Sequence, residues 1–166
     1  MAELTASATF RDAMAEVCSP VTVVTTLDEG VPHGTTVSAF ASLSLDPPMV
    51  TVALDHGSEL LAKVRRTGRL GVNVLGSGQD DLAVAFARKG IDKFAGVGWR
   101  LDHGLPRLDR SVVWLDCDVT TVAAGGDHVI ILAGVRTVSV APAAPLTYHR
   151  RSFGTHAVEF QTATAS

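Results

Sequence analysis

The chain alternates between short runs of β-branched residues and segments in which apolar residues recur at helical spacing. Residues 21–26 are all valine or threonine, and a turn at residues 27–30 separates them from a second extended run that begins at Val31. Residues 49–54 and 69–75 also have the composition or alternation of strands. The pattern predicts a hairpin near the N-terminus, followed by further strands.

Three segments have the apolar spacing and the end signals of helices. The first covers residues 5–18 and ends before Pro20, where a helix cannot easily continue. The second begins after Ser58, an N-cap residue, and ends at Gly68. The third covers residues 79–88. In the first helix the apolar residues fall near one face: Leu4, Phe10, Met14 and Val17.

The second half of the chain predicts a long hairpin. Its strands cover residues 108–122 and 129–140, with the turn at residues 124–127, and a proline-rich connector at 141–145 leads to a short strand at 146–150. Strands joined in sequence by hairpins form antiparallel sheets. About seven strands and three helices therefore favour a mainly β fold, an antiparallel barrel or sandwich with flanking helices.

Length and composition fit a single globular domain. The chain has 166 residues, of which 46% are hydrophobic and 19% charged, so it can bury one sizeable core. We expect one domain over residues 1–166, with its core at about residues 10–154 and a disordered tail at residues 161–166. With no apolar run of about 18 residues and no secretory signal, we expect a cytoplasmic protein.

Charge and cysteine content exclude several kinds of site. A net charge of −3 with scattered cations does not favour a nucleic-acid binder, and the densest basic group, Arg65, Arg66 and Arg69, is expected to be a solvated helix end. Cys18 and Cys117 are too few for a disulfide framework, and we expect both to be buried thiols. The histidines form neither HxxxH nor HExxH, so no metal site is predicted.

The sequence also lacks the common nucleotide and hydrolase motifs. Gly76-Ser77-Gly78 follows a predicted strand and precedes a helix, but Asp81 stands where a dinucleotide-binding fingerprint has its third glycine. The β-α-β alternation of that fold is absent, and no GxSxG motif occurs. A Rossmann fold and a serine hydrolase are therefore both disfavoured.

The stretch from His33 to Pro48, HGTTVSAFASLSLDPP, is the strongest candidate for a ligand site. It gathers hydroxyl and small side chains where a strand gives way to the corner at residues 46–48. Small residues let the backbone approach a flat ligand, and hydroxyl and N–H groups can bind the ring edge and phosphate of a flavin. The same residues also suit an ordinary strand and loop, and their chemistry alone does not choose between the two.

Six segments follow one another in an order shared with a known protein family. They are VTVVTT, GVPHGTTVSAFASLSLDPPMVTVAL, LGVNVLGSGQDDLAVAFA, DKF, GDHVIILAGV and PLTYHRRSFG. Together they resemble the short-chain flavin reductase family over residues 10–154. The resemblance implies an FMN-binding split barrel, usually a homodimer, that reduces FMN or FAD with NADH or NADPH and supplies reduced flavin to a partner monooxygenase.

The resemblance also implies a role for individual residues. His128 matches a family residue near the nicotinamide, although Asp127-His128 also suits a hairpin turn and Tyr148 a barrel rim. Arg151 stands where many relatives carry glycine. The implied cofactor-binding residues are Thr36, Val37, Ser38, Ala39 and Ser42 around the flavin ring, Asp55, His56, Gly57, Ser58 and Glu59 at the ribityl phosphate end, Gln79, Phe86, Lys93 and Phe94 over the flavin tail, and Tyr148, Arg150 and Phe153 beside the nicotinamide.

Three functions remain open from the sequence. Hydride transfer needs aligned cofactors and few side-chain acids or bases, which agrees with a flavin reductase that releases its product. A module that holds flavin tightly, or a flavoenzyme of the same fold that acts on an organic substrate, would need similar residues. The cations that could bind the 2′-phosphate of NADPH are Arg11, Arg150 and Arg151. A dimer is favoured by the exposed strand edges of a small barrel and by the apolar run at residues 129–135.

Overall fold

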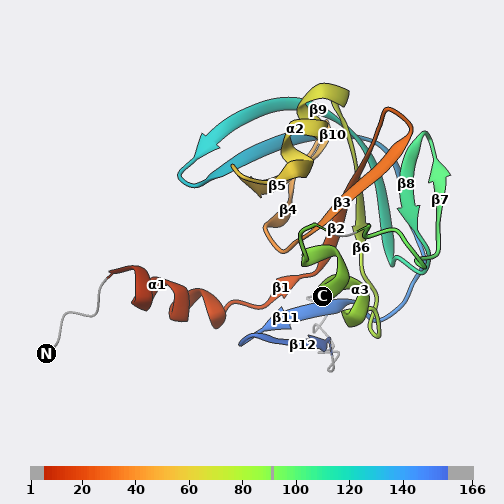
Figure 1. Cartoon of the computed structure of the whole chain (residues 1–166). Coiled ribbons are helices and arrows are strands. Elements are labelled where there is room, and N and C mark those ends of the chain that lie inside the picture. The colour runs from red at the N-terminus through yellow and green to blue at the C-terminus, as the bar shows by residue number, and fades with distance from the viewer. Residues whose placement is uncertain (1–5, 91, 157–166) are drawn as a thin grey trace, which may run out of the picture.

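The computed structural model describes residues 6–90 and 92–156, and most of them lie in antiparallel strands (Figure 1). The helices are α1 (Ala6–Ala15), α2 (Glu59–Thr67) and α3 (Asp80–Ala87). The strands are β1 (Ser19–Pro20), β2 (Thr22–Asp28), β3 (Val31–Val37), β4 (Phe40–Leu45), β5 (Pro48–Asp55), β6 (Arg69–Val74), β7 (Trp99–Asp102), β8 (Leu105–Leu108), β9 (Val113–Gly125), β10 (His128–Val140), β11 (Leu146–His149) and β12 (Ser152–Thr155).

One seven-stranded sheet forms the body of the molecule. Its strand order is β3-β2-β6-β9-β10-β5-β4, and every neighbouring pair is antiparallel. The sheet is not closed, so β3 and β4 are its edge strands. A three-stranded sheet, β1-β11-β12, and the β7-β8 hairpin lie beside it (Figure 1). The predicted mainly β, antiparallel architecture is confirmed.

The core consists of two apolar clusters that the alternation of each strand directs inward. The larger cluster lies inside the curved sheet and is covered by Leu60, Leu61 and Val64 of α2. The smaller cluster lies around α3 and contains the fully buried Phe86 together with Phe94. Because these clusters fix α2 and α3 against the sheet, they also fix the segments that begin and end those helices.

The sequence predicted both ends of α2 correctly and the turn between β2 and β3 only in part. Ser58 is the N-cap residue of α2, and Gly68 ends the helix with φ at 67° while its N–H bonds to the carbonyl of Val64. The turn predicted at residues 27–30 is shorter than expected, because Leu27 and Asp28 continue β2 and pair with Pro32 and Val31.

Five strands were not predicted, and one was predicted to begin too early. The missed strands are β1, β4, β7, β8 and β12, which are short and depend on partners rather than on their own composition. β9 begins at Val113 and not at residue 108, since residues 105–108 pair with β7 instead. The turn between β11 and β12 consists of Arg150 and Arg151, both with positive φ, a conformation that glycine adopts more easily.

The predictions for the N-terminal helix were only partly correct. α1 forms, but it extends away from the sheets (Figure 1), so its apolar face is not buried: Phe10 is 65% exposed, and Met14 and Val17 are also exposed. Cys18, which follows it, is exposed, which contradicts the expectation of a buried thiol. Cys117 is buried as predicted, and burial raises the pKa of its thiol to about 12. Leu4 and the tail at residues 161–166 lie outside the described residues.

The basic group near the end of α2 is not simply a solvated helix end. Arg66 binds the carboxylate of Asp28, and Arg69 binds that of Asp116. Both aspartates are buried. Sequence spacing could not reveal these pairs, because their partners are 38 and 47 residues away. Arg65 is exposed, as expected.

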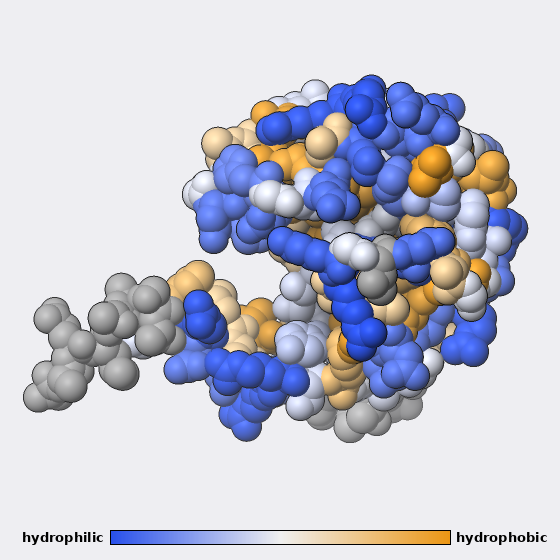
Figure 2. All heavy atoms as spheres, in the orientation of Figure 1, coloured by the Kyte–Doolittle hydropathy of each residue, from blue (hydrophilic) through white to orange (hydrophobic). Residues whose placement is uncertain are grey.

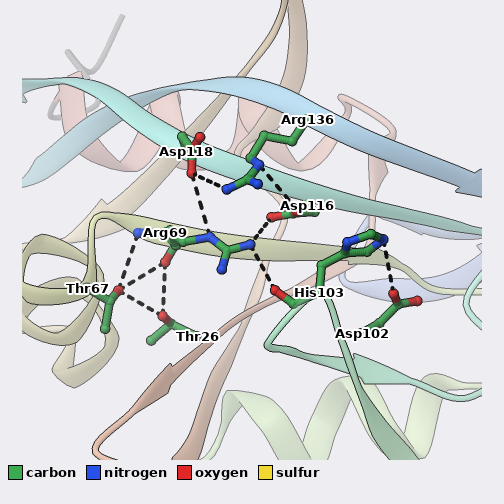
Figure 3. Close-up of polar contacts among 8 residues, drawn as sticks. All are labelled: Thr26, Thr67, Arg69, Asp102, His103, Asp116, Asp118 and Arg136. Atoms are coloured by element: carbon green, nitrogen blue, oxygen red, sulfur yellow. Dashed lines mark hydrogen bonds and ion pairs between the residues drawn. The ribbon is translucent and has the colours of Figure 1, made fainter.

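The Arg69 pair belongs to a larger ionic network (Figure 3). Arg69 Nη2 lies 2.7 Å from Asp116 Oδ1 and donates a second hydrogen bond to the carbonyl of His103 at 3.0 Å. Arg136 Nε is 3.8 Å from the other carboxylate oxygen of Asp116 and also approaches Asp118. The network therefore links the β7-β8 turn to the sheet and compensates a fully buried negative charge.

Candidate functional site

A pocket of about 780 Å³ opens between the edge strand β3, the end of β5, the first half of α2 and the segment at residues 87–94. This volume lies within the range of small-molecule binding sites. β3 pairs with β2 on one side only, so its other side has no strand partner; the Gly34 carbonyl is bound there by Lys93. The predicted ligand stretch thus begins on the wall of this pocket.

The position of β3 relative to α3 is set by side chains. Thr36 Oγ1 donates to the carbonyl of Ala83 at 2.6 Å, and Thr35 Oγ1 lies 3.4 Å from the carbonyl of Phe86. Gly34 lies directly on the Phe86 ring, since a Cβ there would be 2.8 Å from Phe86 Cε1. Small residues in this strand therefore allow close packing against α3 on one side and a ligand on the other.

Lys93 closes one end of the pocket. Its Nζ donates to the carbonyls of Gly34 at 3.1 Å and Phe86 at 2.8 Å. Partial burial lowers the pKa of this ammonium, and nearby Lys89 lowers it further, while Glu59 raises it. Phe94 beside it is buried and packs edge-to-face on Phe86, with ring centroids 5.0 Å apart.

The loop from Asp55 to Ser58 forms another part of the pocket wall. Asp55 Oδ1 accepts a hydrogen bond from the N–H of Gly57 at 2.6 Å, and the Asp55 carbonyl accepts one from the N–H of Ser58 at 2.9 Å. The Ser58 side chain makes no capping hydrogen bond to α2. The N–H of Leu61 bonds the Ser58 carbonyl at 3.1 Å, whereas the Ser58 hydroxyl and the N–H groups of Glu59 and Leu60 have no hydrogen-bond partner among the described residues and can bind an anionic ligand group.

His128 stands at the mouth of this pocket, directly opposite Asp55 in the β10-β5 register. Its Nδ1 is 2.7 Å from Asp127 Oδ1, and this hydrogen bond holds the pKa of Asp127 below its usual value. The N–H of His56 donates to the carbonyl of Asp127, and His56 Nε2 lies 3.2 Å from the carbonyl of Gly126. Asp127 fixes the orientation of the His128 ring, while His56 holds the turn in place.

Three basic side chains that the predicted cofactor-binding residues do not include also line the pocket. Lys63 and Lys89 contribute ammonium groups, and His33 contributes an imidazole. Burial lowers the pKa of His33, and Lys63 lowers it further, whereas Asp28 and Glu59 oppose the shift. The spacing of Lys63 four residues after Glu59 would have placed both on one helix face, but only the fold shows that this face borders the pocket.

Eleven of the predicted site residues line this single pocket. They are Thr36, Val37, Ser38, Ala39, Asp55, Gly57, Ser58, Glu59, Lys93, Phe94 and His128. They come from segments up to 92 positions apart, since His128 and Thr36 both contribute. The grouping supports the interpretation of the stretch as a ligand wall, while the role of each residue remains a prediction.

Seven predicted residues do not line the pocket. Phe86 lies fully buried behind Gly34, and Gln79 uses its amide to bond the N–H of Gly76 and the carbonyl of Asp109. Ser42 lies on the edge strand β4. The remaining four are His56, already described, and Tyr148, Arg150 and Phe153.

These last three residues lie on the β11-β12 hairpin. The rings of Tyr148 and Phe153 pack together with centroids 5.2 Å apart, and both remain partly exposed. Arg150 and Arg151 bind Glu16 and Asp12 of the α1 region, each at 2.7 Å. These contacts hold the β11-β12 turn against α1. Neither guanidinium lines the pocket.

The arrangement suits binding of a planar anionic molecule better than acid–base or metal chemistry. Within residues 6–90 and 92–156, no cluster of three or more histidine, cysteine or carboxylate side chains could hold a metal ion. No helix in the same residues is long and apolar enough to span a membrane. The pocket instead offers edge-strand backbone, small and hydroxyl side chains, and three lysines beside three carboxylates: Lys63, Lys89, Lys93, Asp55, Glu59 and Asp92.

Comparison with known proteins gives a consistent result. Residues 14–157 match the family model described as "Flavin reductase like domain". A reductase component of 4-nitrophenol 4-monooxygenase/4-nitrocatechol 2-monooxygenase from Rhodococcus opacus is 40% identical over 157 residues, which cover 94% of this chain and 84% of that protein. The reductase subunit HsaB of a flavin-dependent monooxygenase from Mycobacterium tuberculosis is 37% identical over 149 residues, covering 87% of this chain and 80% of that protein.

A solved structure also matches most of the chain. It is the NADH:FAD oxidoreductase SgcE6 of Streptomyces globisporus in complex with NAD and FAD fragments. The two structures share 30% sequence identity and a TM-score of 0.87, over 94% of this chain and 98% of that one.

Proposed function

The chain belongs to the family of flavin reductase-like domains, and on that basis we propose that its pocket binds a flavin and that NADH or NADPH is the reductant. The protein is an NAD(P)H:flavin oxidoreductase that supplies reduced flavin to a partner monooxygenase; its relatives are named as reductase subunits or components of monooxygenases, or as a flavin reductase. When bound, the two cofactors supply the redox chemistry, a hydride transfer from nicotinamide to flavin N5. We place this reaction in the cytoplasm.

The pocket beside β3 is the observation that carries this proposal. Its wall at residues 36–39 presents edge-strand backbone and small side chains, which suit the edge of a planar ring. Lys63 and Lys93, with the N-terminus of α2 at Ser58, suit the ribityl phosphate. The volume of about 780 Å³ is within the range of sites that bind small molecules.

His128 would orient the nicotinamide at the pocket mouth. Its ring is held by Asp127 through Nδ1, so Nε2 is left to face a ligand. A fixed donor or acceptor at this point would align the two rings without transferring a proton itself. Such a reaction needs no side-chain nucleophile, because the protein's task is positioning.

We further propose that the protein works as a homodimer. Support comes from two apolar surfaces that this chain leaves uncovered: the outer face of α1, with Phe10 and Met14, and the outer face of β9-β10, with Val122 and Ile130. In Figure 2, apolar residues of the α1 segment lie beside the gap between this segment and the sheets. A second copy that filled this gap would bury both surfaces.

The dimer also gives a role to the hairpin residues that lie outside the pocket wall. Tyr148, Arg150 and Phe153 would act on a nicotinamide only from the second copy, in which case each site would be shared. Light scattering should give twice the chain mass of 17.4 kDa. A monomer at assay concentration would contradict this part of the proposal.

The activity is tested by steady-state oxidation of NADH and NADPH with FMN, FAD and riboflavin supplied in turn. We expect rapid oxidation that depends on added flavin, and no such oxidation with any pair would refute the function. His128→Ala should raise the KM for the reduced nicotinamide by about tenfold, the loss of about one hydrogen bond, and leave the flavin Kd within twofold. His156→Ala, at an exposed position outside the pocket wall, is the matched control.

A further inference from the structure

Lys93 occupies an unusual position for a pocket cation. Two of its three donors are already used, because Nζ bonds the carbonyls of Gly34 at 3.1 Å and Phe86 at 2.8 Å. The carbonyl of Phe86 lies in the last turn of α3, where helical carbonyls have no N–H partner within the helix. The carbonyl of Gly34 lies on an edge strand. A cation that merely awaited a phosphate would not need either contact.

These two contacts join the elements that form the ring wall. Gly34 is in the middle of β3, two residues before Thr36, and Phe86 is near the end of α3. The direct bonds from Thr36 to Ala83 and from Thr35 to Phe86 run between the same two elements. The two hydrogen bonds from Lys93 are donated by a charged ammonium group. Hydrogen bonds from a charged group are stronger than those between neutral groups.

We propose that Lys93 is a positioning residue: it ties the edge strand β3 to the C-terminal end of α3 and so fixes the wall against which the flavin ring lies. Its third donor remains free to face the pocket, which Lys93 also lines. The same ammonium therefore holds the wall before a ligand arrives and contacts the ligand afterwards. This inference rests on the proposed flavin site, but the tie itself exists without flavin.

The experiment compares FMN with riboflavin, which has no phosphate. It thereby separates the role of Lys93 in holding β3 against α3 from a simple contact between Lys93 and the phosphate. Lys93→Met keeps the length of the side chain and removes its charge and donors. We expect the Kd for riboflavin to rise about tenfold, with a further rise for FMN. The absorption spectrum of the bound flavin should shift toward that of free flavin. Lys93→Gln, which keeps an N–H donor, should restore part of the riboflavin affinity and replaces Lys93→Met if that variant does not fold.

Lys89→Met is the comparison variant, because Lys89 also lines the pocket but makes no hydrogen bond to β3 among the described residues. It should weaken FMN binding more than riboflavin binding. Hydrogen exchange of residues 31–39 in flavin-free protein should be faster in Lys93→Met than in the parent and unchanged in Lys89→Met.

Two results would overturn the inference. One is riboflavin affinity in Lys93→Met equal to that of the parent, which would make Lys93 a phosphate contact alone. The other is unchanged hydrogen exchange at residues 31–39 in the same variant. If the parent protein binds neither flavin, the proposed function fails, whereas the exchange measurement still decides whether Lys93 holds β3.

Discussion

Gly34 offers a direct test of how tightly the pocket wall is packed. A Cβ at this position would lie 2.8 and 3.0 Å from two carbons of the Phe86 ring and 3.3 Å from Thr25 Cγ2. Phe86 is fully buried and packs on Phe94 at 5.0 Å, so its ring has little room to retreat. Gly34→Ala should therefore push β3 away from α3 and toward the pocket.

The expected cost follows from overpacking. Inserting a methyl group into a well-packed core costs about 1–3 kcal/mol. In a chain of this size 1 kcal/mol lowers Tm by about 2–4 °C, so Gly34→Ala should melt roughly 2–12 °C below the parent. Differential scanning calorimetry measures this shift, and riboflavin titration should show weaker binding because the ring wall has moved.

Two further variants make the prediction specific. Gly134→Ala is the matched control, because a Cβ there meets only Thr120 Cγ2, at an ordinary 3.6 Å. It should stay within about 0.5 kcal/mol of the parent. Phe86→Leu combined with Gly34→Ala should cost less than the sum of the single changes, since a smaller side chain removes the clash. Equal stability of Gly34→Ala and Gly134→Ala, or strict additivity in the double variant, would refute the steric explanation.

Three other predictions follow from the charged groups. Arg69→Met leaves the fully buried Asp116 without its nearest cation and should cost about 3 kcal/mol in a urea unfolding experiment, whereas Arg69→Met with Asp116→Asn should cost clearly less. The hydrogen bond from Arg66 lowers the pKa of Asp28, so this pair stabilises the fold above the unfolded pKa of about 4 and loses its effect as pH falls. The difference in unfolding free energy between the parent and Arg66→Met should therefore be full at neutral pH and shrink in acid. A difference that persists in acid would contradict the assignment. Burial lowers the pKa of His33, so this imidazole gains its proton only at lower pH than a free one. With the flavin phosphate beside it, FMN should bind more tightly as pH falls through the titration of His33, whereas riboflavin should not. His33→Gln should abolish this difference.

The strongest local patterns identified much of the fold. The β-branched run before Asp28, the Ser58 and Gly68 signals of α2 and the long β9-β10 hairpin all appear where the sequence predicts them, within a few residues. These features depend on residues that are neighbours along the chain. Short strands such as β7 and β12 were missed because their stability comes from pairing with β8 and β11 rather than from their own composition.

The candidate site also combines features that the sequence predicted with features that only the fold revealed. Motif order grouped the stretch at residues 36–39 with His128 by resemblance, and both line one pocket. Gln79 and Phe86 matched the family pattern equally well, yet one holds a turn and the other packs behind the wall. A motif records which residues accompany a site, but not which side of a strand or helix each of them occupies.

By itself, the sequence determined the antiparallel β class, the helix ends and the family, because all three depend on local spacing and on the order of motifs. Only the tertiary structure decided that Lys63, Lys89 and His33 share the pocket with Lys93, and that Arg69 compensates the buried Asp116. These contacts join residues that are far apart in the chain. Their energy comes from burial and charge pairing, which arise only after the sheet has brought the partners together.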